Sequence, residues 1–265
     1  MPSFHRFGQG TYKLEGEQCA ESVETALDLG YRHVDTAQSY DNEEYVGEAL
    51  AASDVDREDV FVATKLATGN LAYDDAVETA RESAEKLGVD TIDLLYVHWP
   101  IDTYDAEETC RALDDLVDEG LVRHVGLSNF MPDQLEEARG NLDAPIFAHQ
   151  VECHPLLQQD ELREFAREDD HWLVAYSPIA RNQVADVPEL REIAEKHDVT
   201  PAQVSLAWLL AKENVAAIPK ATGEDHIREN LAATDLDLDD EDIAAIDDLS
   251  ESNRIVDFEE APWNA

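Results

Sequence analysis

Positive charge is what this 265-residue sequence most lacks. Six Lys and 13 Arg stand against 61 Asp and Glu, so the formal net charge is −42 and the isoelectric point is near 4.2. Such a charge argues against nucleic acid or an anionic membrane as a partner. The acids are spread over the whole chain rather than gathered in a tail, and such a surface repels itself unless salt at about 1 M screens it to about 3 Å. We therefore expect a halophilic protein.

Cysteine and long apolar runs are also scarce. The three cysteines, Cys19, Cys110 and Cys153, have no C-x-x-C spacing, which indicates neither a disulfide framework nor a zinc ribbon. No stretch approaches 18 apolar residues, and the first residues lack the apolar run of a signal peptide. Yet 43% of the residues are hydrophobic, too many for an acidic disordered chain. We expect a soluble cytoplasmic protein with no membrane partner.

Short β-branched, apolar runs alternate with longer amphipathic acidic runs along the whole chain. The apolar runs predict strands at 8–14, 33–37, 60–66, 92–99, 122–128, 146–152, 172–178 and 215–219. The amphipathic runs predict helices at 17–29, 43–52, 73–87, 106–119, 132–139, 158–169 and 224–233, with extra helices at 188–197, 201–212 and 239–249. This series favours an α/β fold: a (β/α)8 barrel with extra helices and a short C-terminal tail, forming a single domain over 1–265.

In such barrels the chemistry lies at the carboxyl ends of the strands. The unusual residues at predicted strand ends are Asp35, Lys65, His98 and the pair Ser128–Asn129, and Tyr40 follows Asp35 in the same loop. About one residue in four is acidic, so Asp35 alone carries little information. Lys and His, in contrast, would each occupy a given position only about 2–3% of the time. The joint occurrence of Tyr40, Lys65 and His98 therefore indicates a site.

These residue types suit proton donation to a reduced carbonyl. A phenol with an ordinary pKa near 10 is a poor donor at neutral pH. A nearby ammonium lowers the pKa of a phenol, and a carboxylate behind the ammonium keeps it charged. Tyr40 would be the phenol, Lys65 the ammonium and Asp35 the carboxylate. His98, as neutral imidazole, is suited to orient the carbonyl oxygen. A group that protonates an alkoxide needs a hydride source, which indicates a nicotinamide cofactor.

The phosphate-binding part of that cofactor site is not of the Rossmann type. No G-x-G-x-x-G joins a strand to a helix, and GQG at 8–10 lacks the third glycine. The segment at 218–230, IPKATGEDHIREN, lies in the last predicted strand and helix, where barrels usually bind phosphate. In this segment Lys220 can reach a phosphate, and Thr222 and Gly223 lead into a helix N-terminus.

Metal binding is not indicated. His149, Cys153 and His154 invite that interpretation, but alternating strand residues point to opposite faces and H-E-x-x-H is absent. The acidic run at 235–246 begins like an EF-hand loop, yet its sixth and twelfth positions are Asp and Ile instead of Gly and Glu. We interpret it as a capped acidic helix.

Motifs from one end of the chain to the other resemble those of the aldo-keto reductases. In family order they are GYRHVDTAQSYDNEEYVGEAL, ATKL, YVHWP, GLVRHVGLSNF, HQVECHP, AYSPIA and IPK…REN, and the length and the ending NRIVDFEEAPW are most similar to the small prokaryotic 2,5-diketo-gluconate reductases. The resemblance implies a tetrad of Asp35, Tyr40, Lys65 and His98. It implies that Ser128, Asn129 and Gln150 hold the nicotinamide carboxamide while Tyr176 stacks on the ring.

The same resemblance assigns the remaining sites. Lys220 would bind the adenosine 2′-phosphate, Glu229 and Asn230 would lie near the adenine, and Ser177, Thr222 and His226 complete the expected cofactor set. Tyr12 and Trp99 would line the substrate pocket. Two positions depart from the family: Ala221 replaces a frequent Ser, and His226 replaces the Arg of many NADPH-dependent members. Neutral His binds phosphate more weakly than the Arg fork does. We therefore expect NADPH as the first choice of cofactor, with NADH accepted.

The predicted activity is reduction of small aldehydes or ketones to alcohols, with hydride from nicotinamide and a proton from Tyr40. Two alternatives stay open, because a fold does not determine a function. A regulatory or sensing protein would bind nicotinamide without turnover, and a barrel lyase or isomerase would use no nicotinamide. Single residues also have structural interpretations: His98 as a core histidine, Asp35 as a helix cap. A monomer is the favoured oligomeric state.

Overall fold

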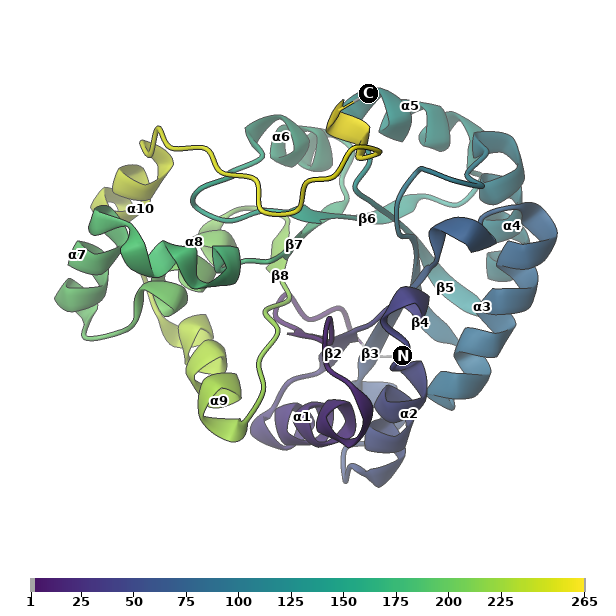
Figure 1. Cartoon of the computed structure of the whole chain (residues 1–265), viewed down its shortest axis with the longest axis horizontal. Helices are drawn as coiled ribbons and strands as arrows, with labels where there is room; N and C mark the ends of the chain where they lie inside the picture. The colour runs from purple at the N-terminus through teal and green to yellow at the C-terminus, as the bar shows by residue number, and fades with distance from the viewer. Residues whose placement is uncertain (1–2, 265) are drawn as a thin grey trace.

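The computed structural model describes residues 3–264. Eight parallel strands in chain order form one sheet. They are β1 (Gln9–Gly10), β2 (His33–Asp35), β3 (Phe61–Leu66), β4 (Ile92–Val97), β5 (Val122–Ser128), β6 (Ile146–Glu152), β7 (Trp172–Tyr176) and β8 (Val215–Ala217). Beside β1, Phe7 pairs in parallel with Ala217, and the Gly8 N–H donates to the Ala217 carbonyl at 3.0 Å. The last strand thus meets the first, and the sheet curls into the expected (β/α)8 barrel (Figure 1).

Helices surround the barrel in the order that the sequence predicts (Figure 1). They are α1 (Gly16–Leu29), α2 (Glu43–Ala52), α3 (Tyr73–Leu87), α4 (Ala106–Asp118), α5 (Pro132–Asn141), α6 (Asp160–Glu168), α7 (Pro188–His197), α8 (Pro201–Ala211), α9 (Glu224–Ala232) and α10 (Asp240–Asp247). None of those within residues 3–264 has the length and apolar composition needed to cross a bilayer.

Six of the eight strands are shorter than predicted, and in three of them the shortening places predicted site residues of the cavity in the following loop. The first ends at Gly10 because residues 11–14 form a tight turn, closed by the Leu14 N–H donating to the Thr11 carbonyl at 2.9 Å. The fourth ends at Val97, so that His98 lies in the following loop. The seventh ends at Tyr176, because Ser177 adopts a left-handed φ of 48°.

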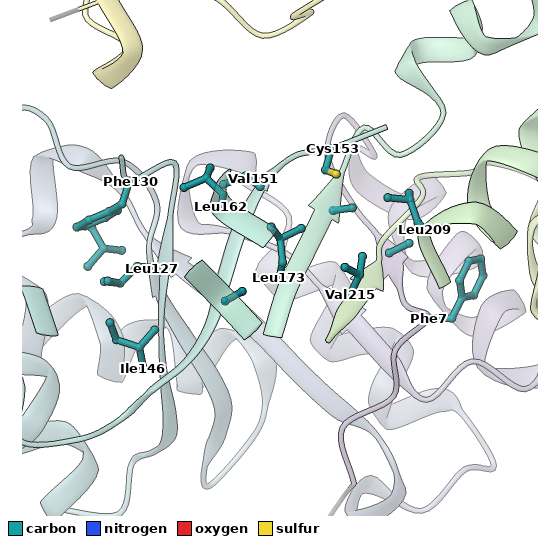
Figure 2. Close-up of a cluster of buried hydrophobic side chains, with 14 of the residues drawn as sticks. Phe7, Leu127, Phe130, Ile146, Val151, Cys153, Leu162, Leu173, Leu209 and Val215 are labelled. Carbon is teal, nitrogen blue, oxygen red and sulfur yellow. The ribbon is translucent and has the colours of Figure 1, made fainter. Parts of the chain in front are cut away.

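Side chains alternate between the barrel interior and the helices along most of the sheet. On β4, Leu94 and Tyr96 pack in a cluster built from other strands, while Leu95 and Val97 pack in the cluster that includes helix residues. The period of two follows from the pleat. Figure 2 shows part of the outer cluster, where Leu173 and Val215 from strands lie near Leu209 from α8. Residues of the inner parity at strand ends therefore point into the barrel.

The amino-terminal end of the barrel is closed by aromatic rings. The Phe4 ring centroid lies 5.1 Å from that of Phe61, 5.3 Å from that of Phe147 and 5.1 Å from that of Trp172. Higher in the barrel, Tyr96 fills the interior where Gly126 has no side chain: a Cβ there would lie 2.4 Å from the Tyr96 ring. With its lower part filled, the barrel can hold a ligand only at the carboxyl ends of its strands.

Candidate active site

A cavity of about 660 Å³ lies at the carboxyl ends of the strands. Its lining includes eleven of the sequence-predicted residues: Tyr12, Asp35, Tyr40, His98, Trp99, Ser128, Asn129, Gln150, Tyr176, Ser177 and Lys220. Strand parity explains this convergence, since Asp35, Gln150 and Tyr176 each continue the inward-facing series of their strand. Lys65 has the same parity on β3 but is fully buried.

Lys65 and Asp35 form a buried ion pair. The Lys65 ammonium donates to one Asp35 carboxylate oxygen and, at 2.7 Å, to the Thr36 carbonyl. The Gln150 side-chain amide donates to the other Asp35 oxygen at 2.7 Å. Burial lowers the pKa of Lys65, and the charge and hydrogen bond of Asp35 oppose that shift. Extra hydrogen bonds on both partners are what a desolvated ion pair requires.

Tyr40 sits at the end of the short 3-10 helix η1 (Gln38–Tyr40), beside the ion pair. Its ring centroid lies 5.2 Å from the Lys65 Nζ and 5.6 Å from the centroid of the His98 ring. The pKa of Tyr40 is not lowered in this structure, so the prediction from the sequence that Lys65 lowers it is wrong. Burial, followed by the charge of Asp35, raises the pKa of Tyr40 well above its usual value. The ammonium is hydrogen-bonded to the Asp35 carboxylate, so Tyr40 stays a neutral phenol.

His98 is held by the loop that follows β4. Its Nδ1 lies 3.2 Å from the Ser39 hydroxyl, and its main-chain carbonyl accepts from the Asn129 side-chain amide at 2.9 Å. Burial, assisted by the charge of Lys65, lowers the pKa of His98 to about 3. The imidazole is therefore neutral at ordinary pH, as expected.

Hydroxyl and amide groups gather at the ends of β5, β6 and β7. The Asn129 side-chain amide donates to the Ser128 hydroxyl at 2.9 Å, and the Tyr176 phenol donates to the Asn129 side-chain carbonyl at 2.8 Å. Gln150 lies on the neighbouring strand, and all four residues line the cavity. Uncharged donors and acceptors next to an aromatic ring match a flat, neutral ring that bears a carboxamide, which is the chemistry of nicotinamide.

The predicted phosphate segment is only partly brought to the cavity. Lys220 lines it with an exposed side chain, whereas Thr222, His226, Glu229 and Asn230 lie outside the lining. The His226 side chain is 76% exposed. Glu229 instead accepts from the Thr200 hydroxyl at 2.9 Å, and Asn230 is buried. As predicted, Gly223 immediately precedes the N-terminus of α9.

Sequence reasoning missed two groups of residues that line the cavity. One is the loop after β7, where Arg181 faces the cavity and residues 180–182 all have positive φ values between 49° and 69°. Non-glycine residues in this region cost about 1–3 kcal/mol each and persist where the surroundings hold them. The other group is Val256 and Phe258 of the C-terminal tail. Val256 and Phe258 belong to the ending NRIVDFEEAPW and Arg181 directly follows the motif AYSPIA, but neither motif by itself places these residues at the cavity.

The candidate metal residues do not come together. The His154 Nε2 pairs with the Glu152 carboxylate at 2.9 Å, and His149 is fully buried on β6. Among residues 3–264, no three His, Cys, Asp or Glu side chains are grouped so as to hold a metal ion.

Comparison with known proteins defines the class of this barrel. The profile of the Aldo/keto reductase family matches residues 5–251. A methylglyoxal reductase, DkgB, of Escherichia coli O157:H7 is 39% identical over 253 residues, 94% of each chain. A glyoxal reductase of Bacillus subtilis (strain 168) is 39% identical over 251 residues, 94% of this chain and 90% of that one.

Solved structures agree with the sequence relatives. The crystal structure of a putative 2,5-diketo-D-gluconic acid reductase B superposes with a TM-score of 0.94 at 40% identity, covering 97% of this chain and 92% of the other. The chain belongs to the Aldo/keto reductase family. It is an oxidoreductase of small carbonyl compounds that uses a nicotinamide cofactor, NADPH or NADH. The alternative of a regulatory or sensing protein gains no support from these relatives.

Proposed function

We propose that this protein reduces small 2-oxoaldehydes such as methylglyoxal and glyoxal, and related aldehydes and ketones, with Tyr40 as the proton donor. The observation that carries the proposal is the position of Tyr40 and His98, whose rings are 5.6 Å apart in one cavity beside a buried ammonium–carboxylate pair. The substrate class is supported by the relatives, which include a methylglyoxal reductase and a glyoxal reductase.

The cofactor, His98, Tyr40 and Lys65 each have a distinct role in the proposed reaction. When bound, the reduced nicotinamide supplies hydride to the carbonyl carbon. His98 orients the carbonyl oxygen through Nε2, since its Nδ1 faces the Ser39 hydroxyl. Tyr40 donates its proton to that oxygen as negative charge develops. Its raised pKa keeps the phenol protonated and ready to donate. Lys65, anchored by Asp35, places a positive charge next to the phenolate that remains.

Ser128, Asn129 and Gln150 would hold the nicotinamide carboxamide, with Tyr176 against the ring. Lys220 would bind the adenosine 2′-phosphate. Arg181, in its constrained loop, adds a further cation to the cavity lining that suits the phosphates of the cofactor. Thr222, His226, Glu229 and Asn230 complete the proposed cofactor site near the adenine end.

NADPH is the proposed first choice of cofactor, with only a moderate preference over NADH. Lys220 and His226 are solvent-exposed, and the first turn of α9 carries the acids Glu224 and Asp225. These carboxylates repel a 2′-phosphate and offset the attraction of Lys220. A kcat/KM ratio that favours NADPH by more than about a thousandfold, over 4 kcal/mol of discrimination, would defeat this part of the proposal.

A carbonyl panel run with both cofactors in about 2 M KCl tests the function, the salt being chosen because it screens the net charge of −42. We expect steady oxidation of NADPH and slower oxidation of NADH with methylglyoxal and glyoxal. Cofactor binding without turnover of any carbonyl would instead favour a sensing protein. Carbonyl consumption without oxidation of the cofactor would favour a lyase or isomerase. The halophilic origin, cytoplasmic location, single-domain organisation and monomeric state stay predictions.

A further inference from the structure

A carboxylate outside the tetrad and the cofactor set joins the barrel to the end of the chain. Glu152 is the last residue of β6 and is fully buried. One of its oxygens accepts the main-chain N–H of Ile255 at 2.6 Å, and the other accepts that of Val256 at 2.7 Å. The His154 Nε2 lies 2.9 Å from the first oxygen. The two bonds to Ile255 and Val256 link Glu152 to residues more than a hundred positions away in the sequence.

The hydrogen bonds are what allow Glu152 to be charged inside the protein. No Lys or Arg pairs with it among residues 3–264, and its salt-bridge partner is His154. Burial raises the pKa of Glu152, but the hydrogen bonds from His154, Ile255 and Val256 outweigh that effect and leave the pKa below its usual value. A buried carboxylate without hydrogen bonds is costly. Glu152 and the two tail amides therefore depend on each other for their hydrogen bonds.

The tail that Glu152 holds forms a wall of the cavity. Val256 and Phe258 line the cavity directly after the two bonded amides. The Phe258 ring centroid lies 4.9 Å from that of Trp99, and the Trp263 ring lies 5.6 Å from the same indole. Since Trp99 follows His98 in the chain, the tail closes the end of the cavity where the carbonyl substrate is proposed to lie. The tail, yellow in Figure 1, extends from α10 to the C-terminus.

We propose that Glu152 is a positioning residue that fastens the tail over the cavity and thereby sets the affinity for carbonyl substrates with a bulky or aromatic substituent. This inference rests on the proposed carbonyl reduction. A small carbonyl compound held by Tyr40 and His98 would make few contacts with the tail. A larger substituent extends toward Phe258 and Trp99, so its binding depends on where the tail is held.

The substitution Glu152→Gln keeps the volume and removes one acceptor. The amide oxygen can still accept one tail N–H, but the amide nitrogen faces the other as a second donor. We expect the Ile255 and Val256 amides to exchange hydrogen for deuterium about tenfold faster or more, since a hydrogen bond to a charged group contributes about 1.5–3 kcal/mol. Asp114→Asn is the matched control: Asp114 also accepts two main-chain N–H groups, from Asp143 and Ala144, both at 2.9 Å, away from the cavity.

Kinetics distinguish a specificity role from a merely structural one. For Glu152→Gln we expect the KM for phenylglyoxal to rise about tenfold, following the same lost hydrogen bond, with a smaller rise for methylglyoxal. The kcat for both substrates and the Kd for NADPH should change less than about threefold, and Asp114→Asn should leave all five values unchanged. Faster tail exchange with an unchanged KM for phenylglyoxal would overturn the proposal. A parallel loss of kcat and NADPH affinity would also overturn it, because Glu152 would then act through Gln150 on β6.

A double-mutant cycle with Phe258→Ala provides the second measurement. If Glu152 acts through the tail, adding Glu152→Gln to Phe258→Ala should raise the KM for phenylglyoxal little further. Fully additive effects would contradict the proposal. If the wild-type protein reduces no carbonyl at all, the proposed function fails, and the exchange rates of the Ile255 and Val256 amides still decide whether Glu152 fastens the tail.

Discussion

Positive charge is buried at one end of the cavity and exposed to solvent at the other. At the catalytic end, Lys65 is fully buried and bonded to Asp35 and to the Thr36 carbonyl. At the proposed phosphate end, Lys220 is exposed, and His226, which lies outside the cavity lining, is 76% exposed. Packing therefore positions the first cation, while solvent surrounds the second. Molar salt screens exposed charges and affects a buried pair much less. The difference indicates that the candidate catalytic residues are built into the barrel, whereas the proposed cofactor preference would depend on a few surface side chains.

Replacing Tyr40 by Phe should have the largest effect. Without the proton donor, kcat for methylglyoxal should fall about a thousandfold, within the range for loss of general acid catalysis. The Kd for NADPH should change less than about twofold, because the phosphate end is untouched. Steady-state kinetics and a cofactor fluorescence titration provide the two values. Retained turnover, or lost cofactor binding, would show that the two ends are not separable.

Lys65→Met should destabilise the fold by about 3–5 kcal/mol, since it leaves the Asp35 carboxylate buried without its counter-ion. Lys220→Met, at the exposed end, should change stability by less than about 0.5 kcal/mol. Chemical unfolding measures both. The double variant Asp35→Asn/Lys65→Met should recover most of the lost stability without recovering activity. Equal effects of Lys65→Met and Lys220→Met would contradict the contrast between the two ends.

His226→Arg tests the exposed end alone. A guanidinium fork should improve NADPH over NADH about tenfold in kcat/KM, or about 1.4 kcal/mol. The kcat at saturating NADPH should stay the same, because the residue lies outside the lining of the cavity. His226→Gln provides the control for side-chain length without charge. If the arginine variant changes kcat and not the cofactor ratio, position 226 is not part of the phosphate site.

The pH profile should show the smallest effect. Burial lowers the pKa of His98 to about 3 and raises that of Tyr40 well above its usual value. His98 would be protonated only in strong acid, and Tyr40 would be deprotonated only in strong base. The profile of kcat/KM should therefore be flat between about pH 5 and about pH 9. An inflection near pH 6.5 that disappears in His98→Gln would show that His98 titrates as an exposed histidine does.

Much of the fold could be predicted because it depends on local patterns. Strand residues such as 94–97 are apolar on both faces, and helices such as α3 carry their buried residues Ala76, Ala80 and Ala84 at helical spacing. Strand ends were less predictable, because backbone dihedral angles such as the positive φ of Ser177 depend on the loop that follows. The tetrad could be located because Lys and His are rare residues in so acidic a chain.

The rest depended on contacts between distant residues. The pKa of Tyr40 moves up rather than down because burial and the charge of Asp35 raise it, and burial is a property of the folded neighbourhood. Arg181 reaches the cavity through a strained loop, and its place just after the motif AYSPIA does not reveal that contact. In the sequence Glu152 is one acid among 61, and only the folded structure shows that it accepts hydrogen bonds from the tail amides.

The sequence by itself determined the barrel, its family and the identity of the four candidate catalytic residues. Hydrophobic periodicity and the positions of rare residue types are properties of the sequence alone. Tertiary structure alone decided the direction of the pKa shift of Tyr40 and which residues close the site. Desolvation and hydrogen bonding act through space, and the Glu152 carboxylate meets the N–H of Ile255 across 103 positions of sequence.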